Sequence, residues 1–334
     1  MAMNWQPLRE MIFANERFVI TSHVRPDADA IGSEIGFAEL LRTLEKQVRI
    51  INPSATPNHL SFLDQENSIL KIGSDVSIDS ACDTDVHLIL DTSAWVQLGD
   101  VRTVLEKTPA KKVVIDHHIS ADDLGASEFK DTTASATGVL VTEFAEFLDQ
   151  PPSGLQAEAL FAAIATDTGW YRFSNADART YHAAARLIEY GVQANRLYRE
   201  LYERSSIARL KLHSRILDRV ALECDGRLAH TFALRKDFSE TGSQPADTED
   251  LVNTCLAVEG VQAAFMIVEQ IDGRMKVSLR SRSDVNVAAI AERFGGGGHR
   301  QAAGAMLAGP MESAQETLIK AYVEVFEGHL NPTP

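Results

Sequence analysis

The chain has 334 residues, which is long enough for two compact domains. Its 45% hydrophobic and 24% charged residues are ordinary for a globular protein and exclude disorder as the main state. Lys and Arg total 32 against 47 Asp and Glu, which gives a net charge of −15. This charge disfavours avid binding along lengthy nucleic acid, but it does not exclude a small phosphorylated substrate held by a local basic pocket or by metal.

The cysteines and the apolar runs indicate a compartment. Cys82, Cys224 and Cys255 lie far apart and form no CxxC pattern, which excludes a disulfide scaffold and a Cys-rich zinc site. Residues 1–13 lack the apolar stretch of a signal peptide, and no apolar run approaches the ~18 residues of a membrane-spanning helix. We therefore expect a soluble protein of the reducing cytoplasm.

The first half of the chain alternates short apolar strands with helices. Strands are predicted at 18–21, 48–51, 86–90 and 113–115, and helices at 33–44 and 101–107. This alternation predicts a parallel sheet with helices on both faces. Ligands of such sheets bind at the carboxyl ends of the strands, and His23, Asp91 and Asp116 each follow a predicted strand.

The second half begins helical and then alternates again. Helices are predicted at 157–165, 176–189, 192–202 and 207–220. Further strands are predicted near 228–234, 261–268 and 275–279, and further helices near 248–258, 285–294 and 311–326. We therefore expect an α/β protein with an N-terminal domain at 1–195, a connecting helical linker at 196–219 and a smaller C-terminal α/β domain at 220–330.

One imidazole and two carboxylates crowd the loop between the first predicted strand and helix. In an extended loop Asp27 and Asp29 can face the same side, close to His23. Like-charge repulsion makes this costly unless a divalent cation is present. One Asp could simply cap the helix predicted from Ser33, but the whole group favours a metal site.

Three more acidic positions follow predicted strands or helices. Asp91 ends the strand at 86–90, where a turn or cap role is the alternative. Asp116, His117 and His118 form a triplet at a strand end, and such a triplet is costly to bury without a function. Asp167 emerges from an apolar helix.

Together these positions provide four carboxylates and two imidazoles as candidate metal ligands: His23, Asp27, Asp29, Asp91, His117 and Asp167. The set suits two divalent ions that share a bridging carboxylate. Mn²⁺ fits the mixed oxygen and nitrogen donors best, with Mg²⁺, Co²⁺ and Zn²⁺ as alternatives. Two ions roughly 3.5–4 Å apart clamp the attacking and leaving oxygens of phosphoryl transfer. The sequence therefore predicts phosphoester chemistry.

The motifs resemble those of a known family, the DHH phosphoesterases. The four motifs are the segment 23–33, the strand end at Asp91, the triplet at 116–118 and the segment 166–169. The tail at 294–304, with its glycine run and His299, resembles the motif of the DHH-associated C-terminal domain. The order is right and nearly the whole chain is covered. The two-domain layout is similar to the nanoRNase/pAp phosphatase type, which implies a catalytic N-terminal domain and a substrate-binding C-terminal domain.

The resemblance also implies a role for each motif residue. One metal would be held by His23, Asp27 and Asp91, and the other by Asp29, Asp91, His117 and Asp167. Asp91 would bridge the two ions. The two residues expected to act in catalysis are Asp116, which would orient ligands, and His118, which would face the scissile phosphate.

The C-terminal region carries a local positive charge. Residues 274–300 contain six basic and two acidic side chains, a net +4, although a solvated strand face is the alternative for Arg274 and Lys276. The resemblance implies that Arg280 binds a substrate phosphate. The expected substrate-binding residues are Arg280, Ser281, Gly296, Gly297, Gly298 and His299, the glycines because their N–H groups can approach a phosphate or base closely.

The implied activity is hydrolysis of short RNA, from di- to pentanucleotides, to 5′-mononucleotides, and of pAp to AMP. Short RNA and pAp are then the expected partners, with no long duplex and no membrane. The alternatives are a cyclic or linear dinucleotide phosphodiesterase, a pyrophosphatase, a long-strand exonuclease and a non-catalytic nucleotide sensor. A homodimer is left open by the sequence.

Overall fold

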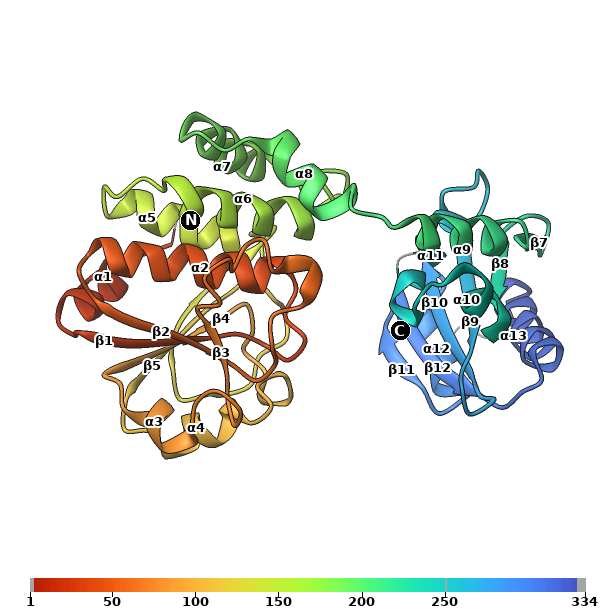
Figure 1. Ribbon diagram of the computed structural model, residues 1–334, viewed down its shortest axis with the longest axis horizontal. Coiled ribbons are helices and arrows are strands. Elements are labelled where there is room, and N and C mark those ends of the chain that lie inside the picture. The colour runs from red at the N-terminus through yellow and green to blue at the C-terminus, as the bar shows by residue number, and fades with distance from the viewer. Residues whose placement is uncertain (1–2, 250, 329–334) are drawn as a thin grey trace. The chain divides into compact units, whose positions relative to one another are not determined.

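The computed structural model describes residues 3–249 and 251–328. The chain forms two compact units, Met1–Arg204 and Ser205–Pro334 (Figure 1). The division falls within the segment 196–219. Each unit has its own sheet and its own hydrophobic core, so the two are described separately.

The first unit contains a six-stranded, fully parallel sheet in the order β3-β2-β1-β4-β5-β6. Its strands are β1 Arg17–Thr21, β2 Gln47–Asn52, β3 Ile69–Lys71, β4 Val86–Leu90, β5 Lys111–Asp116 and β6 Ser127–Lys130. The predicted parallel sheet is confirmed. The short strands β3 and β6 at the two edges were not predicted. From β1 the chain adds strands first on one side (β2, β3) and then on the other (β4, β5, β6). Ligands of such sheets bind at this change of direction, between β1 and β4.

Helices cover both faces of this sheet, as the alternation predicts (Figure 1). They are α1 Gln6–Phe13, α2 Ala28–Thr43, α3 Ile78–Cys82, α4 Val101–Lys107, α5 Thr137–Phe147, α6 Gly154–Asp167, α7 Ala178–Glu189 and α8 Ala194–Tyr202, with 3₁₀ turns η1 Asn58–Leu60 and η2 Trp95–Gln97. Ile20 and Leu88 pack in the core with α2, α5 and α6. Their neighbours Val19 and Ile89 pack on the opposite face with α4.

Helix α2 begins earlier than the periodicity predicts. It starts at Ala28, five residues before the predicted start at Ser33, because Asp27 caps it. The Oδ1 of Asp27 accepts hydrogen bonds from the N–H groups of Asp29 and Ala30 at 3.0 and 3.1 Å. The prediction that Asp29 lies in an extended loop is therefore wrong: it lies in the first turn of the helix.

Close packing of α2 against α6 depends on a glycine. A Cβ atom on Gly32 would lie 2.3 Å from the carbonyl oxygen of Ala159 and 2.9 Å from the Cβ of Ala163. Any side chain at this position would therefore push the helices apart. This contact fixes α2, which carries Asp29, against α6, which ends at Asp167.

The second unit is a smaller α/β body with a mixed sheet in the order β11-β12-β10-β9-β8-β7. Its elements are α9 Ile207–Leu217, β7 Ala221–Glu223, β8 Leu228–Ala233, α10 Arg235–Thr241, η3 Pro245–Thr248, α11 Leu251–Leu256, β9 Ala263–Glu269, β10 Met275–Ser281, α12 Val287–Glu292, β11 Gly297–His299, β12 Ala302–Leu307 and α13 Met311–Phe326. Strands β8 and β9 are parallel, and the other neighbours are antiparallel. The predicted α/β fold class is confirmed.

The helices are too short to cross a lipid bilayer. Helices α2 and α13 have 16 residues each, below the ~20 that a spanning helix needs. Nowhere in residues 3–249 and 251–328 is there a helix both long and apolar enough for that role.

Candidate active site

The predicted ligands gather at the carboxyl edge of the parallel sheet. His23 lies two residues after β1, Asp91 directly follows β4, and His117 directly follows β5. Because β1, β4 and β5 are parallel neighbours, their carboxyl ends lie side by side. The start of α2 adds Asp27 and Asp29, and the end of α6 adds Asp167.

The six side chains form two adjoining groups around Asp91. The Nε2 of His23 lies 3.4 Å from Oδ2 of Asp91 and 4.0 Å from Oδ1 of Asp27. The Nε2 of His117 lies 3.5 Å from Oδ1 of Asp91 and 3.6 Å from a carboxylate oxygen of both Asp29 and Asp167. The ligand atoms of His23, Asp27 and Asp91 lie within 4.8 Å of one another, and so do those of Asp29, His117 and Asp167, close enough in each case to share an ion. Asp91 presents one oxygen to each group.

The backbone of Asp91 is strained. Its φ of 61° lies in the left-handed region, which is uncommon for a residue other than glycine. Its N–H donates to the carbonyl of Ile115 at 3.0 Å, and the Thr137 hydroxyl donates to its Oδ1 at 2.9 Å. Such strain persists where the surroundings hold it and is typical of functional sites.

A contact from Nδ1 to a backbone carbonyl orients each imidazole so that its Nε2 faces the carboxylates. The Nδ1 of His23 lies 3.0 Å from the carbonyl oxygen of Val24, and the Nδ1 of His117 lies 3.2 Å from that of Ala134. A carbonyl can only accept, so in the neutral tautomer that fits these contacts Nδ1 carries the proton and Nε2 offers a lone pair. This is the tautomer that metal-binding histidines use.

Asp29 is held by the start of helix α5. Its two carboxylate oxygens accept from the N–H groups of Thr137 and Gly138 at 2.7 and 2.9 Å, and the Ser33 hydroxyl donates at 3.1 Å. The positive end of the α5 dipole adds to these bonds. Sequence reasoning missed Thr137, which contacts both Asp29 and Asp91. The small residues at 135–138, which include the hydroxyls of Ser135 and Thr137 at the start of an apolar run, were the available signal.

The charges of these carboxylates show whether the residues are suited to a cation. Burial, followed by the negative charges of Asp29, Asp27 and Asp167, raises the pKa of Asp91 well above its ordinary value. Burial raises the pKa of Asp29, and burial together with the Asp29 charge raises the pKa of Asp167 to about 8. A divalent cation relieves this repulsion, and carboxylate plus imidazole is a suitable donor set, so the residues fit a metal.

Asp116 and His118 form a hydrogen-bonded pair beside the cluster. The Nδ1 of His118 lies 2.8 Å from Oδ1 of Asp116, and the Ser93 hydroxyl donates to Oδ2 at 2.6 Å. Burial opposes the charge on Asp116, yet these hydrogen bonds lower its pKa to about 2. The hydrogen bond to Asp116 in turn raises the pKa of His118, whose side chain is 47% exposed. With Nδ1 engaged, Nε2 is free to meet a substrate.

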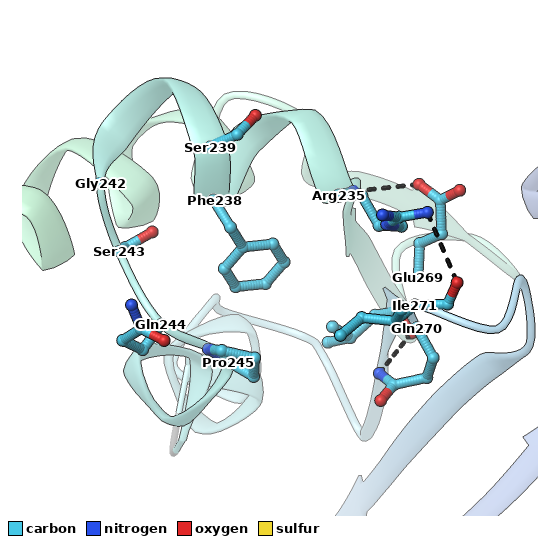
Figure 2. A pocket seen from close by; sticks show the side chains of 11 residues that line it. Arg235, Phe238, Ser239, Gly242, Ser243, Gln244, Pro245, Glu269, Gln270 and Ile271 are labelled. Atoms are coloured by element: carbon cyan, nitrogen blue, oxygen red, sulfur yellow. Dashed lines mark hydrogen bonds between the residues drawn. The ribbon is translucent and has the colours of Figure 1, made fainter.

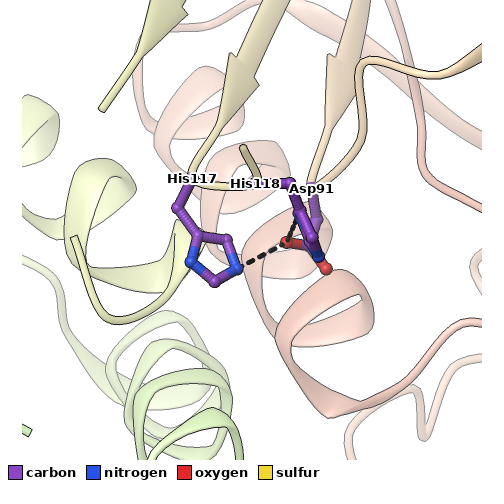
Figure 3. Close-up of side chains that lie close together, drawn as sticks. All are labelled: Asp91, His117 and His118. Carbon is purple, nitrogen blue, oxygen red and sulfur yellow. Dashed lines mark ion pairs between the residues drawn. The ribbon is translucent and has the colours of Figure 1, made fainter. Parts of the chain in front are cut away.

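His118 also stands within reach of the metal ligands. Its Nδ1 lies 3.7 Å from Oδ1 of Asp91, so Asp91, His117 and His118 form a third group of candidate ligands (Figure 3). The sequence places His118 outside the ligand set, and its shorter bond to Asp116 fits that assignment. A metal-binding role for His118 is the alternative that this geometry raises.

The predicted substrate-binding residues of the second unit differ in accessibility. Arg280 lies on β10, partly exposed, with its Nη1 donating to the carbonyl of Leu279 at 3.0 Å. Ser281 lies on the opposite face of β10, where it is 6% exposed and its hydroxyl bonds to Gln262 and Ser283. This position argues against direct contact between Ser281 and a substrate.

The glycine run serves close packing at two of its predicted positions. A Cβ on Gly296 would lie 2.1 Å from the carbonyl oxygen of Gly304, and one on Gly298 would lie 2.5 Å from that of Ala302. The missing side chains of both glycines therefore let the segment 296–299 approach the backbone of β12 closely. Gly297 faces open space, and His299 is exposed at the end of β11.

Comparison with known proteins agrees with this geometry. The model of the DHH family, N-terminal domain, matches residues 17–166, and that of the DHHA1 domain matches residues 228–328. The first match contains every candidate metal ligand except Asp167, which follows it by one residue. The match to both family models, with carboxylates and imidazoles gathered at the carboxyl edge of the parallel sheet, identifies the chain as a hydrolase of the phosphoesterase class. More specifically, the chain belongs to the DHH family, with a DHHA1 domain following the DHH domain.

Several curated relatives are similar over most of the chain. It is 30% identical to the bifunctional oligoribonuclease and PAP phosphatase NrnA of Thermus thermophilus, over 96% of this chain and 94% of the relative. It is 28% identical to the Bacillus subtilis protein of the same name, over 87% and 90%. The cyclic-di-AMP phosphodiesterase GdpP of Geobacillus thermodenitrificans is 29% identical, over 96% of this chain but 49% of the relative.

Solved structures show the same fold. An exopolyphosphatase-related protein from Bacteroides fragilis superposes with a TM-score of 0.89 at 25% identity, covering 96% of this chain and 97% of that one. The exonuclease RecJ bound to manganese superposes with a TM-score of 0.54 at 13% identity, covering 96% and 95%, which shows the shared fold alone.

Proposed function

We propose that the protein hydrolyses short oligoribonucleotides to 5′-mononucleotides and pAp to AMP, in a reaction that depends on divalent cations. The observation that carries this proposal is the cluster of four carboxylates and two imidazoles around Asp91. The substrates are supported by the relatives named bifunctional oligoribonuclease and PAP phosphatase, 90–94% of whose length this chain matches.

The cations would bind in two places. One would be held by His23, Asp27 and Asp91, and the other by Asp29, Asp91, His117 and Asp167. When bound they would supply Lewis acidity and neutralise the charge of the reacting phosphate. Mn²⁺ suits the mixed donors best, with Mg²⁺, Co²⁺ or Zn²⁺ as alternatives.

Both reactions break the same kind of bond. A water oxygen attaches to phosphorus, the bond from phosphorus to the 3′-oxygen breaks, and that oxygen takes up a proton. With an oligonucleotide the products are a 5′-mononucleotide and a shortened chain. With pAp they are AMP and inorganic phosphate. One arrangement of protein groups can therefore serve both substrates.

Asp116 and His118, beside the candidate metal ligands, would supply the proton that the leaving oxygen takes up. Asp116 fixes the His118 ring through Nδ1 and raises its pKa, which favours the protonated ring, in which Nε2 can donate. From there it would donate a hydrogen bond to a nonbridging phosphate oxygen or a proton to the leaving oxygen. Arg280 of the second unit would bind a phosphate of the substrate.

A length series of labelled RNA tests the proposal. Labelled di- to pentanucleotides, a ~30-mer at fixed salt and pAp are incubated with the protein and Mn²⁺, and products are separated by chromatography. We expect mononucleotides from the short substrates, AMP from pAp and little from the 30-mer. The Asp91→Ala variant is the control that should be inactive. Dinucleotides and pAp left intact by the wild-type protein would refute the proposed function.

A cyclic-dinucleotide phosphodiesterase is the second candidate. It is favoured by the match of 96% of this chain to the relative named cyclic-di-AMP phosphodiesterase GdpP. Adding cyclic-di-AMP and its linear product to the same substrate panel separates the two functions. Faster hydrolysis of the cyclic substrate than of linear dinucleotides would favour this second candidate.

A further inference from the structure

Strand β10 presents a row of polar side chains on one face. Lys276, Ser278 and Arg280 alternate with Val277 and Leu279, which are 1% and 0% exposed in the core of the second unit. Alternate residues of a strand point to opposite faces, so the three polar side chains lie in line along the same face.

The neighbouring strand leaves this row accessible. On β12, Gly304 lies opposite Ser278 and contributes no side chain, and Met306 lies opposite Lys276. Met306 is 39% exposed. The part of the sheet face around the polar row is therefore open to a ligand.

The row borders a pocket of about 300 Å³, a volume in the range of small-molecule sites. Its lining residues are Pro245, Thr248, Glu249, Val252, Met266, Val268, Gln270, Lys276, Ser278 and Arg280. The pocket shares Pro245, Val268 and Gln270 with a neighbour of about 430 Å³, into which the ring of Phe238 points (Figure 2). The hollow surface thus continues beyond the row.

Two cations of the row lack acidic partners, in contrast to Arg274 and Arg293. Arg274 pairs with Asp272 at 2.7 Å, and a similar ion pair at 2.9 Å engages Arg293. Lys276 and Arg280 form no ion pair within the described part of the chain. In a protein of net charge −15, two unpaired cations beside one pocket favour an anionic ligand.

Lys276 and Arg280 are far enough apart along the strand to contact different phosphates. Three residues of β10 lie between them, so their Cα atoms are about 14 Å apart. This spacing lets the two cations contact successive phosphates of one chain. The hydroxyl of Ser278 lies between them, and the carboxylate of Glu249 can accept from a sugar hydroxyl.

We propose that Lys276, Ser278 and the adjoining pocket form an extension subsite, which binds the phosphates and sugars that follow the phosphate held by Arg280 in substrates longer than a dinucleotide. This inference rests on the proposed function and adds to it a determinant of substrate length. A dinucleotide carries too few phosphates to occupy both cations, whereas a tetranucleotide can.

Steady-state kinetics on two substrate lengths test the subsite. The quantity compared is kcat/KM for a 5′-phosphorylated tetranucleotide divided by kcat/KM for a dinucleotide. Loss of one charge-assisted contact predicts a fall of about tenfold in this ratio for Lys276→Glu and a smaller fall for Lys276→Ala. The matched control is Arg274→Ala, two residues away and already paired with Asp272, which should leave the ratio unchanged. An unchanged ratio in Lys276→Glu would overturn the inference.

A binding measurement tests the subsite independently of catalysis. Fluorescence anisotropy with the full chain in EDTA gives the affinity for labelled tetranucleotide at several salt concentrations. Lys276→Ala should weaken binding and lower the salt slope by about 0.7, the value for one phosphate contact on a single strand. An unchanged slope contradicts the subsite. A wild-type protein that binds tetranucleotide through Lys276 but hydrolyses no dinucleotide would instead refute the proposed function alone. Equal thermal stability of the variants shows that the exposed substitution leaves the fold intact.

Discussion

The ammonium group of Lys130 lies 3.3 Å from Oδ2 of Asp116, on the neighbouring strand of the sheet. Asp116 is 0% exposed, and its other oxygen binds His118. Lys130 also donates to the hydroxyl of Ser93 and to the carbonyl of Ser120, both at 2.7 Å. It therefore compensates a buried carboxylate and ties down the loop that follows His118.

Replacing Lys130 should impair catalysis through His118. In Lys130→Met, Asp116 loses the contact that fixes the orientation of its carboxylate, so the His118 ring is held less rigidly. We expect kcat to fall about tenfold with little change in KM, because His118 would act in the chemical step. Stability should fall by about 1–3 kcal/mol, since a buried charge loses a partner. Steady-state kinetics and urea unfolding measure both effects, with the exposed Lys107→Met as control.

A double-mutant cycle separates this role from a general loss of structure. In the His118→Ala background the Lys130→Met change should cost little further activity, because the ring that Lys130 helps to position is already gone. If Lys130→Met reduces kcat equally in both backgrounds, Lys130 does not act through His118. Recovery of kcat in Lys130→Arg would support the positioning role.

Asp91 is expected to be the residue whose loss empties both cation sites. It alone presents one oxygen to each imidazole, 3.4 Å from His23 and 3.5 Å from His117. Asp91→Ala should therefore reduce both bound metal and turnover, the latter by at least about a hundredfold. Elemental analysis after dialysis gives the metal content, and Asp100→Ala, an exposed acidic position, is the control. Full metal content in Asp91→Ala would show that Asp91 bridges nothing.

Part of this site is visible in the sequence because three of the candidate ligands follow predicted strands. His23, Asp91 and His117 end apolar runs, and parallel strands bring such ends together whatever the loops do. The start of α2 is different. Its position depends on hydrogen bonds that the Asp27 carboxylate accepts from the N–H groups of Asp29 and Ala30. The polar side chains within 27–33 also hide the helical periodicity.

Other contacts depend on packing that one sequence does not reveal. Lys130 meets Asp116 because of the register between β5 and the short edge strand β6, which has no strong apolar pattern. Thr137 reaches Asp29 because α5 begins beside α2, more than a hundred residues away in the sequence. The opposite facing of Ser281 and Arg280, by contrast, follows from strand alternation and could have been predicted.

Removing divalent cations should destabilise the protein. Burial, together with the charges of neighbouring carboxylates, raises the pKa values of Asp29, Asp91 and Asp167, so their charged forms are unfavourable when no cation is bound. We expect Tm to fall in EDTA and to recover with Mn²⁺. Bound metal should raise the free energy of unfolding by about 2.7 kcal/mol when free metal is a hundredfold above Kd. Differential scanning calorimetry measures the shift. An identical shift in Asp91→Ala would place the stabilising ion elsewhere.

Arg280 should affect substrate binding and not metal binding. It lies in the second unit, on β10, and its guanidinium has no acidic partner in the residues that the structure describes. Arg280→Ala should raise KM for dinucleotides and pAp about tenfold, since a charge-assisted contact to phosphate is lost. Metal content and Tm should match the wild type. Joint loss of metal and substrate binding would mean that Arg280 is structural.

Glu34 is expected to make stability depend on pH. It is fully buried in α2, where its Oε2 accepts from the Asn52 amide at 2.8 Å. Burial raises its pKa from 4.5 to about 8, although the hydrogen bond from Asn52 opposes the shift. In the unfolded chain the carboxyl ionises near its ordinary value, so between pH 4.5 and about 8 the unfolded state binds fewer protons than the folded one. The stability that Glu34 contributes is therefore full below pH 4.5 and is lost as pH rises through about 8.

The variant Glu34→Gln removes this titration while keeping the shape of the side chain. Its stability relative to the wild type should rise between pH 5.5 and pH 7.5, by at most about 1.4 kcal/mol per pH unit. Urea unfolding at several pH values measures the free energy of unfolding of both proteins. Subtracting the wild-type value from that of the variant removes the contributions of the other titrating groups. Glu66→Gln, at an exposed position, should give a flat difference. A flat difference for Glu34→Gln as well would show that Glu34 is ionised in the folded protein, with its charge balanced by groups around Asn52.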